Sequence, residues 1–210
     1  MTETIDRSVD RWYFSLMAPR SRGEKYAWLD PSAAYINADA FHAMLDDLLE
    51  PFDRDDIDVV AGFDAAGFVL GAAMATRMRK GFLTIRKGGK MPVDFDVVDM
   101  TNYSGQTQQM EMRNPAFAPG TRALLVDQWI ETGGTMTAGI QLVERQGGIV
   151  AGIAAVCIEE TDASREMAAR FKMSSCALPG SPIQEQCNRQ TLDSFETYRP
   201  ENGFPDIDRG

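Results

Sequence analysis

The sequence predicts an α/β fold: a single domain with a mostly parallel sheet flanked by helices, a long mobile loop and an irregular C-terminal tail. Short apolar runs alternate with helical patterns in two separate stretches, residues 57–85 and 123–158. Strands that alternate with helices in this way form parallel sheets. The 210 residues, of which 44% are hydrophobic, can bury the core of one such domain.

The termini differ in composition from the middle of the chain. An N-terminal arm, residues 1–35, is rich in aromatic side chains, and the core is expected to span residues 36–173, starting with an amphipathic helix from about Ala38 to Leu49. The tail, residues 174–210, is rich in Pro, Gly, Asn and Asp and is expected to be irregular. It either wraps around a dimer partner or lies extended on the surface.

The first βαβ unit begins with a short apolar run at residues 58–62, which reads as a buried strand. Residues 63–67 form a turn, and a helix rich in Ala, Leu and Met follows from Phe68 to Met78. The next strand runs into a glycine-rich basic loop at residues 86–92. Residues 86–118 as a whole show poor periodicity and many polar side chains, which is typical of a mobile loop or of a hairpin that folds over a ligand.

The second unit contains the strongest indication of a ligand site. An apolar strand ends at Asp127 and Glu131, and the turn Thr132-Gly133-Gly134-Thr135 opens a helix from Met136 to Arg145, which leads to a strand at residues 149–158. Glycines let the backbone approach a ligand closely, and the helix N-terminus offers unpaired N–H groups to a phosphate. Asp127 at the strand end can accept hydrogen bonds from ribose hydroxyls. The same strand, turn and helix also occur as a plain connection without a ligand.

The charge distribution favours a small anionic ligand. The chain carries 31 Asp and Glu against 21 Lys and Arg, yet residues 77–90 contain six basic residues and no acid. A net charge of −10 disfavours binding to a nucleic acid. No apolar stretch approaches the roughly 18 residues of a membrane span, and the N-terminus lacks the apolar segment of a signal peptide, so we expect a cytoplasmic protein.

The order and spacing of these motifs resemble the type I phosphoribosyltransferases, and within that family the adenine-specific branch most closely. The resemblance runs from about Trp28 to Val156. It implies transfer of a 5-phosphoribosyl group from phosphoribosyl pyrophosphate to a purine or related nucleobase, which gives a nucleoside 5'-monophosphate. It also implies Mg²⁺ held mainly through the substrate, with no direct metal ligands from the protein, and a homodimer.

The resemblance assigns roles to individual residues. Asp127 and Glu131 are the expected catalytic residues, Asp127 and Gln128 the ribose contacts, and Thr132, Gly133, Gly134 and Thr135 the 5'-phosphate site. The pyrophosphate site is expected to comprise Asp64, Ala65, Arg86, Lys87 and Lys90, and the base pocket Trp28, Phe63 and Trp129.

The chain departs from the family pattern on the pyrophosphate and base sides of the site. Ala66 stands where the adenine-specific branch has an Arg, and Gln128 replaces the second acid of the ribose pair. The Leu-Glu-Tyr of the long loop is replaced by Thr101-Asn102-Tyr103, which removes a carboxylate. Glu131 replaces an Ala; it either restores an acid–base group near the base or only favours the N-terminal pole of the helix.

Three functions fit these features. The first is a phosphoribosyltransferase with altered base specificity. The second is an enzyme that acts on ribose 5-phosphate or a nucleoside monophosphate without pyrophosphate, which the missing Arg at position 66 favours. The third is a non-catalytic protein that senses nucleotides with the same pocket.

Overall fold

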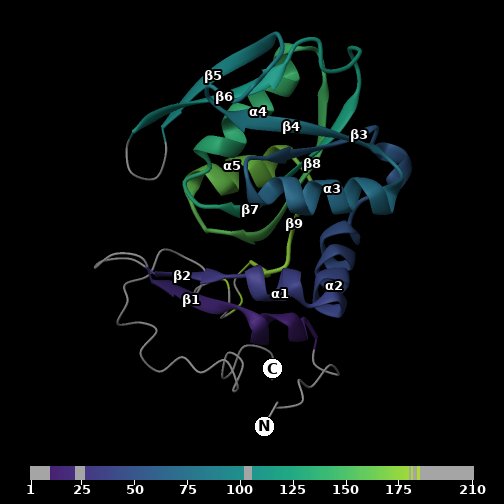
Figure 1. The fold of residues 1–210 in the computed structure, drawn as a ribbon. Helices are drawn as coiled ribbons and strands as arrows, with labels where there is room; N and C mark the ends of the chain where they lie inside the picture. The colour runs from purple at the N-terminus through teal and green to yellow at the C-terminus, as the bar shows by residue number, and fades with distance from the viewer. Residues whose placement is uncertain (1–9, 22–26, 102–105, 180, 182–183, 185–210) are drawn as a thin grey trace.

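The computed structural model describes residues 10–21, 27–101, 106–179, 181 and 184 (Figure 1). Its centre is a seven-stranded sheet with the order β5-β6-β4-β3-β7-β8-β9. The five strands that run parallel to their neighbours in the middle and at one edge are β3 (Val59–Phe63), β4 (Gly81–Lys87), β7 (Arg122–Ile130), β8 (Ile149–Ile158) and β9 (Met173–Ser175). The other edge is an antiparallel hairpin of β5 (Phe95–Thr101) and β6 (Thr107–Arg113).

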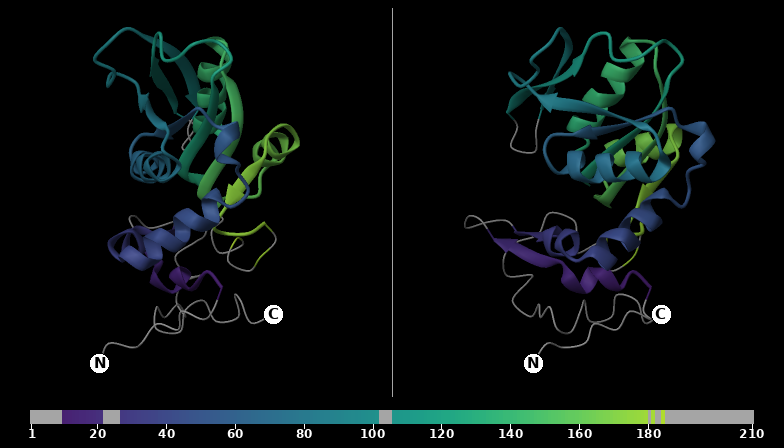
Figure 2. Two further views of the ribbon diagram at one scale, coloured as in Figure 1. Left: turned by 90° about the vertical axis from the view of Figure 1, so that its right-hand side faces the viewer. Right: turned by 45° about the vertical axis from the view of Figure 1, so that its right-hand side comes forward.

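Helices cover both faces of the sheet. On one face, α3 (Ala66–Met78) packs in a core cluster with α2 (Ala38–Leu49); on the other, α4 (Gly134–Arg145) and α5 (Asp162–Arg170) contribute to a second cluster. Neighbouring strand residues alternate between the clusters: Leu124 belongs to the first and Leu125 to the second. Figure 2 shows the sheet between these helices. The predicted α/β fold with a mostly parallel sheet is therefore confirmed.

The N-terminal part of the chain forms a layer at one end of the main sheet (Figure 2). It consists of the 3-10 helix η1 (Trp12–Leu16), the antiparallel pair β1 (Ala18–Ser21) and β2 (Ala27–Asp30), the short helix α1 (Ser32–Ile36) and then α2. Tyr13, Phe14 and Met17 are buried in the same cluster as α3. The predicted bounds of α2 are confirmed, because Asn37 caps it through a hydrogen bond from the Ala40 N–H. A second 3-10 helix, η2 (Arg54–Asp56), leads into β3.

The structure decides one alternative about the irregular segments and corrects one expectation. Of the alternatives for residues 86–118, the structure shows the hairpin β5–β6, whose tip at 102–105 lies outside the described residues. The tail does not begin as irregular chain: Ser174 and Ser175 belong to β9, because their backbones pair with β8. Residues 185–210 lie outside the described residues. In the described part of the chain, no helix has the length and apolar character needed to cross a bilayer.

Candidate active site

The turn after β7 leads into a helix end that has no side-chain cap. Gly133 has φ 81° and precedes α4, and a Cβ there would lie 2.8 Å from the Cβ of Ala163 on α5, so both conformation and space require glycine. No side chain caps α4 and no acid stands in its first turn. The first N–H groups of α4 therefore remain available to an anion such as a phosphate.

A second helix begins beside the same strand end. Helix α3 starts at Ala66 without a side-chain cap and without an acid in its first turn. A Cβ on Gly67 would lie 2.7 Å from the main-chain oxygen of Val126 and 3.3 Å from Oδ1 of Asp127. The first turn of α3 thus touches the carboxyl end of β7. The preceding peptide bond, between Asp64 and Ala65, is cis.

Asp127, on β7, lies against the first turn of α3, and α4 begins seven residues after it. It is partly buried, and its Oδ1 accepts a hydrogen bond of 2.7 Å from the N–H of Gln128. Burial raises the pKa of Asp127 to about 7, while the Gln128 N–H and the positive charge of Lys87 act in the opposite direction. Lys87, at the end of β4, is therefore close enough to influence the carboxylate, as expected for one ligand site at this edge of the sheet.

Gln128 is held from the N-terminal layer. The hydroxyl of Tyr35, in α1, donates a hydrogen bond of 3.1 Å to Oε1 of Gln128. This contact places the N-terminal layer at the carboxyl end of β7. Sequence reasoning missed Tyr35, because the two residues are separated by 93 positions and no local pattern links them.

The basic loop after β4 lies at the other side of the site. Lys87 and Lys90 are exposed, whereas Arg86 is partly buried and its Nε has no hydrogen-bond partner among the described residues. The loop is held by Glu111, a buried acid of β6 that sequence reasoning missed. One signal was available: Glu111 is the single acid in the stretch 107–113.

The remaining residues of the turn lie between these groups. Glu131 and Thr135 are partly buried and Thr132 is exposed. A Cβ on Gly134 would lie 2.6 Å from the main-chain oxygen of Thr101, the last residue of β5. The β5–β6 hairpin therefore lies against the start of α4.

Comparisons with known proteins identify the family. A model of the phosphoribosyl transferase domain matches residues 34–193. The chain belongs to this family. With it, the chain belongs to the pentosyltransferase class of enzymes.

Individual relatives are adenine phosphoribosyltransferases. The one from Dinoroseobacter shibae is 43% identical over 125 residues, which is 60% of this chain and 69% of the relative. The one from Thermobifida fusca is 38% identical over 153 residues, 73% of this chain and 85% of the relative. The crystal structure of the Rhodothermus marinus enzyme superimposes with a TM-score of 0.70 at 30% identity and covers 76% of this chain and 92% of its own.

Of the three residues expected to form the base pocket of this phosphoribosyltransferase, Phe63 and Trp129 pack in different core clusters, on opposite faces of the sheet. Trp28 lies on β2, and its side chain is outside the described residues. Phe63 is 0% exposed and its ring packs against Gly139 and Ile85 in the core beneath α4, so its assignment to the base pocket does not fit this structure. Trp129 is partly buried and its indole N–H donates to Oε1 of Glu159, 2.8 Å away.

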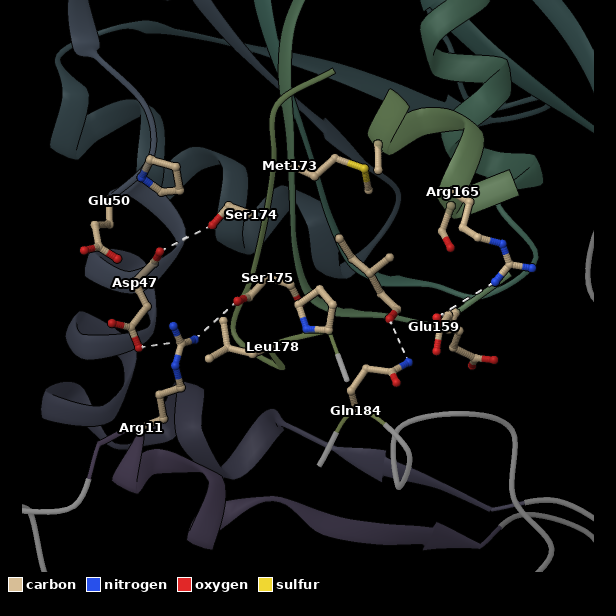
Figure 3. Close-up of a pocket in the computed structure, with 16 residues that line it drawn as sticks. Arg11, Asp47, Glu50, Glu159, Arg165, Met173, Ser174, Ser175, Leu178 and Gln184 are labelled. Carbon is tan, nitrogen blue, oxygen red and sulfur yellow. Dashed lines mark hydrogen bonds and ion pairs between the residues drawn. The ribbon is translucent and has the colours of Figure 1, made fainter. Parts of the chain in front are cut away.

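A cavity of about 290 Å³ lies outside the predicted site, between α2, α5 and the end of the sheet (Figure 3). None of the predicted site residues lines it. Arg11 reaches into it but is already engaged: its Nη1 lies 3.9 Å from Oδ2 of Asp47 and donates to the main-chain oxygens of Ser175 and Cys176. The cavity meets the predicted site through Glu159, the partner of Trp129.

Proposed function

We propose that this enzyme transfers the 5-phosphoribosyl group of phosphoribosyl pyrophosphate to a purine base, with adenine as the first candidate. The observation that carries the proposal is a pair of uncapped helix N-termini next to one strand: the first turn of α3 lies against Asp127 of β7, and α4 begins at the turn that follows β7. Phosphoribosyl pyrophosphate has a phosphate at one end of its ribose and a pyrophosphate at the other. One anion site at each helix start, with the ribose bound by the carboxylate of Asp127, would match that shape.

The 5'-phosphate end is assigned to the turn of α4. The main-chain N–H groups of Gly134, Thr135 and Met136 and the hydroxyls of Thr132 and Thr135 would hold the phosphate. Asp127 and Gln128, at the end of β7, would bind the ribose hydroxyls. Gln128 has its oxygen committed to Tyr35, so it offers its amide N–H groups to the ribose.

The pyrophosphate end is assigned to the first turn of α3 and to the basic loop. Arg86, Lys87 and Lys90 supply cations, with Asp64 and Ala65 at the turn. The Nε of Arg86 supports this assignment, because a buried donor without a partner costs about 1–3 kcal/mol and an anionic ligand would satisfy it. These groups would stabilise the negative charge that develops on the leaving pyrophosphate.

The reaction is a displacement at the anomeric carbon of the ribose. A ring nitrogen of the base forms a bond to C1', and the bond from C1' to the pyrophosphate oxygen breaks, so that its electron pair leaves with pyrophosphate. The base loses one proton, and Glu131 is the proposed acceptor because it lies one residue from the phosphate turn. The ionised Asp127 would also stabilise positive charge on the sugar.

Magnesium held through the substrate is compatible with the residues of the site. In the described part of the chain, no three His, Cys, Asp or Glu side chains gather into a metal-binding group. The oxygens of the pyrophosphate and ribose of the substrate are the hard ligands that Mg²⁺ prefers, and water would supply the rest, so the metal would be held mainly through the substrate. When bound, the metal would neutralise charge on the pyrophosphate.

A second candidate follows from Ala66, which supplies no cation to the first turn of α3. An enzyme that acts on ribose 5-phosphate or on a nucleoside monophosphate needs the α4 turn and Asp127 but no pyrophosphate site. The two candidates share the ribose 5-phosphate half of the site and differ only in the half around α3.

Calorimetry together with a turnover assay tests the proposal. Phosphoribosyl pyrophosphate should bind in the presence of Mg²⁺, and adenine should then release pyrophosphate, with hypoxanthine and guanine as alternative acceptors. Binding of ribose 5-phosphate and nucleoside monophosphates, but not of phosphoribosyl pyrophosphate, would refute the proposal and support the second candidate.

A further inference from the structure

Glu111 bonds three consecutive backbone N–H groups of the basic loop. Its side chain is only 3% exposed. Oε1 accepts from the N–H of Gly89 at 2.6 Å, and Oε2 accepts from the N–H groups of Lys90 at 3.1 Å and Met91 at 2.9 Å. A single carboxylate from β6 therefore determines the shape of the loop that follows β4.

The backbone of the loop is suited to an anion. Gly89 has φ 78°, and consecutive N–H groups in such a turn form a concave site for negative charge. A further hydrogen bond of 2.8 Å, from the N–H of Gly88 to the main-chain oxygen of Gln109, attaches the loop to β6. In the strand register Glu111 stands opposite Arg86.

The surroundings of Glu111 favour the ionised form of its carboxylate. Burial acts to raise its pKa, but the three loop N–H groups and the charge of Arg86 outweigh burial, so the pKa lies below its ordinary value. A neutral side chain of the same size could not accept all three hydrogen bonds, since an amide has one acceptor oxygen.

We propose that Glu111 is a positioning residue for the pyrophosphate end of the site: it holds residues 88–91 in the turn that keeps the ammonium groups of Lys87 and Lys90 beside the ligand. Glu111 itself does not touch the substrate in this role. The proposal rests on the proposed function, because it assigns the two lysines to pyrophosphate.

The proposal predicts a selective defect. Without the carboxylate, three N–H groups lose their acceptor and the loop no longer has one preferred shape, so the lysines must be ordered when the ligand binds. Pyrophosphate and phosphoribosyl pyrophosphate should then bind more weakly, whereas ribose 5-phosphate, held by the α4 turn, should bind as before. A general loss of structure would weaken all these ligands together.

The test compares Glu111→Gln with Asp99→Asn. Asp99 is an exposed acid on the same hairpin that bonds the Gln109 side chain and makes no bond to the loop, so it is a matched control. With Mg²⁺ present, Glu111→Gln should weaken pyrophosphate binding and raise the KM for phosphoribosyl pyrophosphate about ten- to a hundredfold, and ribose 5-phosphate affinity should change less than about twofold. Asp99→Asn should change neither.

Two results would overturn the proposal: unchanged pyrophosphate affinity in folded Glu111→Gln, or equal losses for pyrophosphate and ribose 5-phosphate. If that variant does not fold, hydrogen exchange on the native protein decides, because the N–H groups of residues 89–91 must be protected. Exchange at the rate of free turn amides would contradict the anchoring of the loop by Glu111.

Should the native protein bind neither pyrophosphate nor phosphoribosyl pyrophosphate, the proposed function fails, while protected amides would still support the anchoring of the loop by Glu111.

Discussion

Asp127 lies where the ribose is expected to bind. Its burial disfavours the charged carboxylate and raises its pKa. The first turn of α3 packs on one side of it, and its Oδ1 is bonded by the Gln128 N–H. A carboxylate with a pKa of about 7 can exist in both protonation states near neutral pH. The ionised form accepts hydrogen bonds from ribose hydroxyls more strongly, because both of its oxygens carry negative charge.

Asp127→Asn tests the role in ribose binding. The substitution keeps the bond to the Gln128 N–H but removes the charge, so affinity for ribose 5-phosphate should fall by roughly 1.5–3 kcal/mol, about ten- to a hundredfold. Inorganic phosphate, which has no ribose, should bind as it does to the native protein. Calorimetry with both ligands measures the difference, and equal losses would mean that Asp127 is structural.

The pH dependence of stability tests the environment of Asp127 independently. Because its folded pKa, about 7, lies above the ordinary value of 3.8, the folded protein binds this proton more readily than the unfolded chain between those values. Its contribution therefore stabilises the fold most below pH 3.8 and is lost as the pH rises through 7. Asp127→Asn should raise the melting temperature more at pH 8 than at pH 5. An identical change at both values would show that the pKa of Asp127 is not raised.

At the scale of elements, the site is made where the ends of β4 and β7 meet the starts of α3 and α4. Helix starts after glycine-containing turns have a local signature, and for that reason the α4 turn could be predicted from the sequence. For residues 86–118 the sequence left a mobile loop and a hairpin as alternatives. It could not decide between them because β5 has few buried residues and therefore a weak strand pattern. Glu111 and Tyr35 had no local signature, because their partners lie across the sheet or in another layer.

Gly134→Ala tests the contact between the hairpin and α4. A Cβ on Gly134 would meet the backbone oxygen of Thr101 at 2.6 Å. The substitution should therefore cost about 1–3 kcal/mol of the free energy of unfolding, although Ala usually favours a helix.

The matched control for Gly134→Ala is Gly81→Ala. A Cβ on Gly81 meets nothing nearer than Cγ2 of Val59 at 3.9 Å, so the change in stability should stay within about 0.5 kcal/mol. Denaturant unfolding measures both variants. If Gly134→Ala were as stable as Gly81→Ala, the hairpin would not lie against α4 as the structure shows.

At the scale of the whole molecule, the alternating pattern of strands and helices was enough to predict the fold, but not the direction of every side chain. Phe63 stands at a strand end near the predicted site, and only the packing of α4 shows that its ring is in the core. An acidic chain has one basic stretch, at residues 77–90, and the fold brings the end of that stretch to Asp127. The two candidate functions differ in whether these basic side chains bind a pyrophosphate.

Competition by pyrophosphate, the last prediction, decides between them. Because Ala66 supplies no cation, a true phosphoribosyltransferase must stabilise the leaving group with Lys87 and Lys90 together with Mg²⁺. Pyrophosphate at millimolar concentration should then displace phosphoribosyl pyrophosphate.

The double variant Lys87→Gln, Lys90→Gln should lose turnover at least about tenfold more than it loses affinity for a nucleoside monophosphate, because the leaving group gains its charge in the transition state. The variant Arg79→Gln with Lys80→Gln removes equal charge from the same stretch and should leave this ratio unchanged. If pyrophosphate does not compete and Ala66→Arg brings no gain in affinity for phosphoribosyl pyrophosphate, the enzyme acts on ribose 5-phosphate or nucleoside monophosphates without pyrophosphate.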